Sequence, residues 1–254
     1  VYTTWGIKLN NVILAVSTGL VTSLIPNIVT SFTKGNMKDV NNKFNKAFQC
    51  VLLVIVPITL FFSLLTNSIW TLFYGKSYYG PIVYKAFVFT ALFGGVYTII
   101  VNTLQGINKY KLVILTVCLG LVINGILDVP CMLFCNKIGL NASYGAVMAD
   151  LIGYSISTFI ALFVLKRKYG FNYKDTVMTL PKYFISWIVF VLSILSLNLI
   201  VPTNLDNRLL QIPILCLYGI VSFGIYLFIS YKNGNLVKVF GVGVKRKIDK
   251  IFKK

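Results

Sequence analysis

Residues 142–165 read ASYGAVMADLIGYSISTFIALFVL, an apolar run in which Asp150 is the only charged residue. A helix needs roughly 20 residues to cross a hydrocarbon core of about 30 Å, and this run is long enough. In lipid the backbone polar groups must be satisfied within the segment, which favours a helix over an isolated strand. The run therefore predicts a membrane-spanning helix with one carboxylate inside it.

The same pattern recurs along the chain. Its 254 residues are 57% hydrophobic and 12% charged, with a mean hydropathy of +0.82, which is outside the range of soluble domains. No period-two alternation indicates a barrel wall. We predict an all-α polytopic bundle of about seven spans over 1–232, followed by a basic cytoplasmic amphipathic tail over 233–254. The other six spans are expected at about 9–32, 48–65, 86–104, 112–133, 183–201 and 210–230.

Charge predicts the orientation of the bundle. The chain has 24 Lys and Arg against six acidic residues and no His, a formal charge of +18. The basic residues gather in alternate connections, and by the positive-inside rule these connections are cytoplasmic, which puts the N-terminus outside and the C-terminus inside. Topology accounts for the excess charge, so we expect no nucleic-acid partner. The basic stretches at 34–48 and in the tail are amphipathic and are expected to lie on anionic membrane lipids.

A chain of this kind that starts outside and without Met is expected to be part of a longer protein, with an N-terminal lobe preceding it. Enzymatic activity is not expected. Membrane-embedded transferases and polymerases need an acid, base or nucleophile at the surface, and the sequence has no His or Glu and only Asp206 among the outer loops.

Polar groups inside the spans are the first candidate site. Asn124 and Asp128 are four residues apart, hence on one helical face, and Asp150 lies at a similar depth on the next span. Two carboxylates in low dielectric repel unless they share a proton or hold a cation such as Na⁺. The alternative is structural: Asp128 ends its helix at the interface, two residues before Pro130, and Asp150 is hydrogen-bonded to a serine or tyrosine of a neighbouring helix. The residues leave both interpretations open.

Lys8 and Lys85, at the outer starts of the first and third spans, form a second group. Both could line a positively charged outer cavity that attracts a phosphate-bearing substrate. The alternative is that they snorkel to the lipid headgroups, which is favoured for Lys85.

Four stretches of the chain, in this order and spacing, resemble the second half of the MATE-like flippases of the MOP superfamily. The resemblance covers about residues 5–170 and is closest to the stage V sporulation protein B and lipid II flippase branch of polysaccharide transporters. The stretches are TSLIPNIVTSFTKGNMKDVNNKFNKAF at 22–48, LFYG at 72–75, LQGINKYK at 104–111 and YGAVMADLIGY at 144–154.

This resemblance implies helices eight to fourteen of a fourteen-helix fold. It implies that Lys8 lines the central cavity. In relatives with a sodium site, an Asn and an Asp four apart join a Thr and a backbone carbonyl of the next helix. Asn124 and Asp128 match the first pair, Ala146 falls at the carbonyl, and Asp150 falls at the Thr. An Asp in place of the Thr leaves both Na⁺ coupling and H⁺ coupling open. No other cofactor is expected.

The function that the resemblance implies is export of an undecaprenyl-linked saccharide, lipid II or a polysaccharide repeat unit, across the bacterial inner membrane. The mechanism would be ion-coupled alternating access. A MATE-type cation-coupled drug exporter is the alternative.

Overall fold

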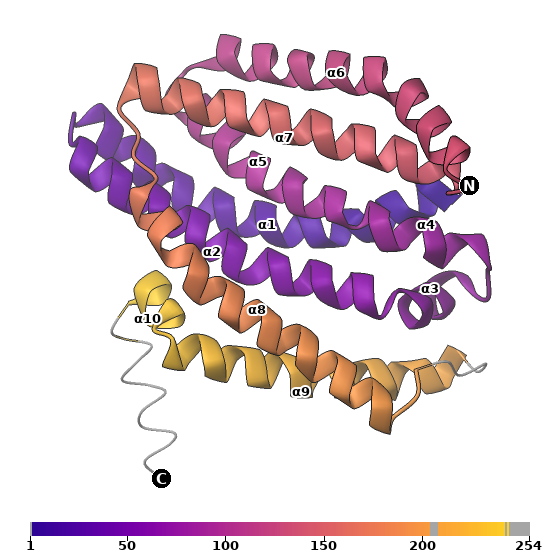
Figure 1. Cartoon of the computed structure of the whole chain (residues 1–254). Helices are drawn as coiled ribbons and strands as arrows, with labels where there is room; N and C mark the ends of the chain where they lie inside the picture. Colours follow the sequence, from indigo (N-terminus) through magenta and orange to yellow (C-terminus); the bar gives the residue numbers. More distant parts are fainter. Residues whose placement is uncertain (1, 204–207, 242, 244–254) are drawn as a thin grey trace.

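The structure is a computed structural model that describes residues 2–203, 208–241 and 243, and in these residues all regular structure is helical (Figure 1). Seven helical segments are long and apolar enough to cross a membrane, which confirms the predicted fold class. The third span is built from two helices, α4 and α5, broken at Val88. The spans are α1 (Tyr2–Thr33), α2 (Met37–Leu64), α4 (Tyr79–Phe87) with α5 (Phe89–Gly106), α6 (Tyr110–Lys137), α7 (Ala142–Tyr169), α8 (Lys174–Ile200) and α9 (Arg208–Lys232).

Two further short helices lie at the ends of spans. Helix α3 (Thr66–Tyr74) follows α2, and α10 (Asn235–Phe240) follows α9. The predicted division into a bundle and a tail at residue 233 stays a prediction, since residues 244–254 lie outside the described part of the chain.

The spans form a centre and two flanking hairpins (Figure 1). Helices α1, α2 and α5 pack against one another in the centre. The α6–α7 hairpin lies against α5, and the α8–α9 hairpin lies against α2 on the other side. The free faces of α6, α8 and α9 carry exposed large apolar side chains such as Ile126, Leu199 and Ile220, as a lipid-facing surface requires.

Lysine and arginine side chains gather at one end of the bundle, where α1, α5, α7 and α9 end and α2, α6, α8 and α10 begin, on the left of Figure 1. We call this the basic end, and the opposite one the far end. The segregation follows from the alternation that the sequence shows. Which end faces the cytoplasm remains a prediction. The described basic residues here are Lys34, Lys38, Lys43, Lys46, Lys109, Lys111, Lys166, Arg167, Lys168, Lys174, Lys182, Lys232 and Lys238.

The stretch 34–48 does not form a separate surface helix, so that expectation was wrong. Its residues from Met37 onward are the first turns of α2, capped by the Asn36 side chain, which accepts from the Asp39 amide at 3.1 Å. The apolar face is covered by protein rather than lipid, because Phe44 is buried against Phe171, with ring centroids 5.2 Å apart.

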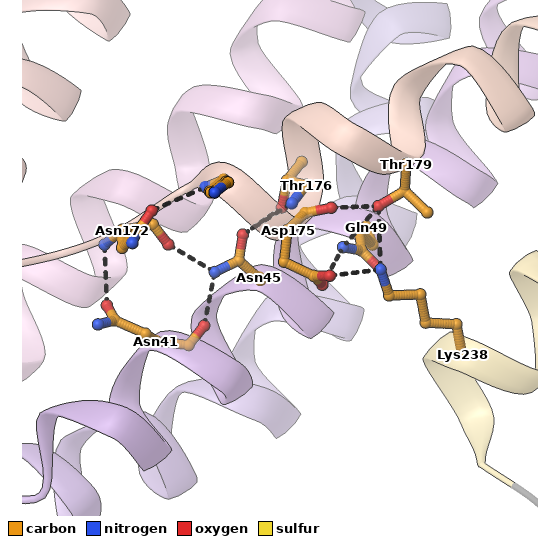
Figure 2. Close-up of polar contacts among 9 residues, drawn as sticks. Asn41, Asn45, Gln49, Asn172, Asp175, Thr176, Thr179 and Lys238 are labelled. Carbon is orange, nitrogen blue, oxygen red and sulfur yellow. Dashed lines mark hydrogen bonds and ion pairs between the residues drawn. The ribbon is translucent and has the colours of Figure 1, made fainter.

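The polar face of the same turns holds the start of α8, through an amide stripe formed by Asn41, Asn45 and Gln49 (Figure 2). Asn45 donates to the Asn172 carbonyl at 2.6 Å and accepts from the Thr176 amide at 3.0 Å. These bonds satisfy backbone groups that a helix start leaves without an intrahelical partner.

Either side of Asn45, the stripe makes further contacts. Asn41 accepts from the Asn172 amide at 2.9 Å, and Gln49 donates to Asp175 at 2.9 Å. Asp175 also pairs with Lys238 of α10 at 2.6 Å, so the stripe ties three helices together (Figure 2). Nearby, burial raises the pKa of the Tyr173 hydroxyl, which stays a donor to the Leu162 carbonyl at 3.0 Å.

Candidate functional site

The candidate site lies at a close contact between α6 and α7, which small residues make possible. A Cβ added to Gly153 would lie 2.9 Å from the Gly120 carbonyl, so the two backbones are in contact there. Ser157 donates to the Thr116 carbonyl at 2.9 Å. Small residues spaced by four let membrane helices approach in this way. On α7 the spacing is Gly145, Ala149, Gly153 and Ser157.

Close packing brings the polar side chains of the two helices together. Asn124 of α6 donates through its amide nitrogen to Asp150 of α7 at 2.7 Å. Both side chains are half-buried. The predicted meeting of Asn124 and Asp150 is therefore present in the structure, as a direct hydrogen bond.

The other two predicted ion-site residues flank this pair. Asp128 lies one turn further along the face of α6 that carries Asn124, and Ala146 lies one turn before Asp150 on α7; both are half-buried. No hydrogen bond or ion pair joins Asp128 to Asp150 in the described part of the chain. The amide of Asn124, rather than a second carboxylate, is the direct partner of Asp150.

The pair borders a cavity of about 340 Å³ between α1, α5, α6 and α7. Leu14 closes it on the α1 side, and Tyr97 and Thr98 come from α5. The Tyr97 hydroxyl lies 2.7 Å from the hydroxyl of Thr116, and the Tyr154 ring packs edge-on against that of Tyr97 at 6.5 Å. The cavity thus sets a carboxylate, an amide and hydroxyl groups among apolar walls.

The Asp150 carboxylate differs from the carboxylates at the basic end, which form ion pairs. Asp39 pairs with Lys43 at 2.7 Å, and Asp175 pairs with Lys238 at 2.6 Å. Asp128 and Asp150 form no ion pair with any lysine or arginine of the described residues. A charged carboxylate inside a span is costly to bury without a partner of opposite charge.

The donor set suits a proton or a hard monovalent cation. Asn124 keeps its amide oxygen free of the bond to Asp150, and the second carboxylate stands one turn away. No three His, Cys, Asp or Glu side chains of the described residues could share a metal ion. Oxygen ligands for a cation would therefore have to include the amide and backbone carbonyls.

Lys8 belongs to a different surface, the free face of α1. Its side chain is exposed, as are those of Asn11 and Asn27 on the same helix. Around Lys8, α1 also exposes Ile7, Val12 and Val16, whereas from residue 17 to residue 33 it exposes no large apolar side chain. Lipid is a poor neighbour for the face over residues 17–33, which indicates water or a polar protein surface beside that part of α1.

Lys85 is also exposed, on α4 near the far end. Its backbone carbonyl accepts from Ser63 at 3.1 Å, which ties α4 to α2. No contact joins its side chain to Lys8 among the described residues. A shared cavity for the two lysines remains a prediction.

Reasoning from sequence missed the hydroxyl groups around the ion-site candidates. Tyr97, Thr116 and Ser157 form a chain of bonds beside Asn124 and Asp150. The available signal was position: Ser157 lies seven residues after Asp150, two turns along one face.

Comparison with known proteins shows similarity to a curated flippase. The chain is 29% identical over 242 residues to the lipid II flippase MurJ of Bacillus subtilis (strain 168), and the match covers 92% of this chain and 43% of that protein. The chain thus spans less than half of the length of the curated relative it matches. No family model matches the chain.

Proposed function

We propose that this chain is one lobe of a bacterial inner-membrane flippase that exports an undecaprenyl-linked saccharide, such as lipid II. The sequence similarity over 92% of the chain supports the substrate class. The polar free face over residues 17–33 of α1 supports a second lobe that faces α1 across a polar cavity, and the exposed Lys8 on the same helix would attract the substrate phosphates. The proposed activity is transport rather than catalysis.

The observation that supports ion coupling is the hydrogen bond between Asn124 and Asp150, which borders a cavity that α1 also lines. A ligand shifts an equilibrium between two conformations only by its differential affinity for them. A cation or proton held by Asn124, Asp128, Asp150 and the Ala146 carbonyl draws α6 and α7 together and biases α1 toward one orientation. Release of the ion permits the other orientation.

We expect Asp150→Asn, in the intact protein reconstituted in vesicles, to lower the rate of lipid II export at least tenfold, since loss of even an outer-shell partner of a bound ion commonly costs 10- to 100-fold in affinity or activity. The remaining export should no longer respond to Na⁺ or to pH. Export is measured with a fluorescent lipid II analogue under separate Na⁺ and pH gradients.

The matched control is Asp39→Asn, the same chemical change in a solvent-exposed ion pair, whose loss changes stability little. Asp150→Thr tells the two ions apart: Na⁺ coupling survives it, whereas H⁺ coupling is lost with the titratable group. Unchanged export and ion response in Asp150→Asn would rule out this site.

A MATE-type drug exporter is the second candidate, favoured by the same intramembrane carboxylate and the large apolar surfaces. The two differ in a growth test. A flippase restores growth to cells depleted of their own lipid II flippase, whereas an exporter raises tolerance to cationic drugs and leaves the depleted cells dying.

A further inference from the structure

Helices α7 and α8 are consecutive in the chain, yet they part from each other. Four residues, 170–173, join them, and α8 then packs against α2 and α9 while α7 stays with α6 and α5 (Figure 1). The junction is held at the basic end by Tyr173, which bonds to the Leu162 carbonyl, and by the amide stripe of α2. The two helices are therefore the walls of a V-shaped crevice that is narrowest at the basic end.

This crevice holds a cavity of about 600 Å³ with walls that are almost entirely carbon. Val56 and Val96 lie in its floor, on α2 and α5. Phe159 of α7 and Phe184 of α8 line it and are 71% and 55% exposed, so the cavity opens outward between the two helices. At the depth of the spans, hydrocarbon is the only solvent available to fill such an opening.

Basic side chains lie below the crevice on the same helix faces. Lys166 follows Ser155, a lining residue, by 11 positions, which returns it to the same face of α7 about 17 Å nearer the basic end. Lys174 precedes Leu192, another lining residue, by 18 positions, which is five turns, and so lies on the same face of α8. Both lysines are exposed and pair with no acid of the described residues.

We propose that this crevice binds an anionic phospholipid from the leaflet at the basic end, with its phosphate between Lys166 and Lys174 and its acyl chains against Val56 and Val96. On α7 the separation of about 17 Å between Ser155 and Lys166 is close to a hydrocarbon half-core of about 15 Å. The bound lipid fills the space that the divergence of α7 and α8 leaves. The proposal concerns the folded bundle and does not depend on what the protein transports.

Selectivity for an anionic headgroup follows from the two lysines. Each basic residue near an anionic surface favours binding by about fivefold, so two favour it by about 30-fold over a zwitterionic lipid. A shell lipid that merely touches the protein has no such preference.

Trp187 lines the crevice and reports on its contents. The intact protein is reconstituted in phosphatidylcholine vesicles that contain increasing fractions of phosphatidylglycerol brominated on its acyl chains. The emission of Trp187 is taken as the difference between the protein and its Trp187→Phe variant. We expect half of this emission to be quenched at a mole fraction about 30-fold lower than with brominated phosphatidylcholine.

Lys166→Gln with Lys174→Gln should move the phosphatidylglycerol curve onto the phosphatidylcholine curve, whereas Lys38→Gln, at the same end on α2, should leave it in place. Identical curves for the two lipids in the unaltered protein would overturn the proposal. So would a double variant whose curve does not move. Recovery of emission on adding undecaprenyl phosphate at an equal mole fraction would also overturn it and would assign the crevice to an isoprenoid chain.

Discussion

Gly145→Ala is expected to destabilise the α6–α7 hairpin by about 1–3 kcal/mol, although alanine is the better helix former. A Cβ at this position would lie 2.4 Å from the backbone carbonyl carbon and oxygen of Cys131 and from the Met132 nitrogen. Backbone atoms cannot rotate away as a side-chain end does, so the two helices must separate. Larger residues such as leucine should prevent the hairpin from packing at all.

Thermal unfolding of the detergent-solubilised protein measures the effect, and Gly125→Ala supplies its control. Gly125 lies on α6 of the same hairpin, and a Cβ there meets nothing within 4 Å. That variant should gain up to about 1 kcal/mol from lower backbone entropy in the unfolded chain. The two substitutions add the same atoms and should change stability in opposite directions. An equal response would mean that α6 and α7 are not in backbone contact at Gly145.

Asn45→Ala is expected to release the start of α8. The side chain is 3% exposed and bonds to the Asn172 carbonyl, the Thr176 amide and the Thr176 hydroxyl. Each buried backbone group left without a partner costs about 1–3 kcal/mol, so the loss is about 2–4 kcal/mol. Hydrogen exchange measures it locally: the Thr176 amide should exchange at least 30-fold faster, because each 1.4 kcal/mol is a factor of ten.

Asn42→Ala is the matched control, since Asn42 is the exposed neighbour of the stripe on the same helix. Exchange at Thr176 should be unchanged in that variant. If Asn45→Ala also leaves exchange at Thr176 unchanged, the amide stripe does not cap α8.

Hydropathy sufficed to predict the seven spans, because a long apolar run leaves the backbone in lipid few alternatives to a helix. It did not predict where helices end. The segment expected at 48–65 begins at Met37, because its polar first turns are buried against residues 170–173 rather than solvated. A polar pattern by itself does not reveal whether water or another helix satisfies it. Asn41, Asn45 and Gln49, four apart, were the signal for the second case.

In the candidate ion site, too, part of the arrangement was predictable from the sequence and part was not. The spacing of Asn124 and Asp128 and the depth of Asp150 are properties of single helices. They were sufficient to predict that the polar residues of the two helices lie close together. The identity of the direct partner, Asn124 rather than Asp128, depends on the register between α6 and α7. That register is decided by the glycines at which an added Cβ would meet the facing backbone, and Gly145 and Gly153 are such positions while Gly125 is not.

The amide stripe also sets an order of events during synthesis. Asn45 and Thr176 are 131 residues apart, so at 5–20 residues per second the cap partner of α8 exists for roughly ten seconds before α8 does. Over that interval the amide stripe of α2 is already synthesised, whereas the α8–α9 hairpin that packs on it is not. The last two spans consequently join a template instead of nucleating their own arrangement, which makes the α8–α9 hairpin the final part of this bundle to assemble.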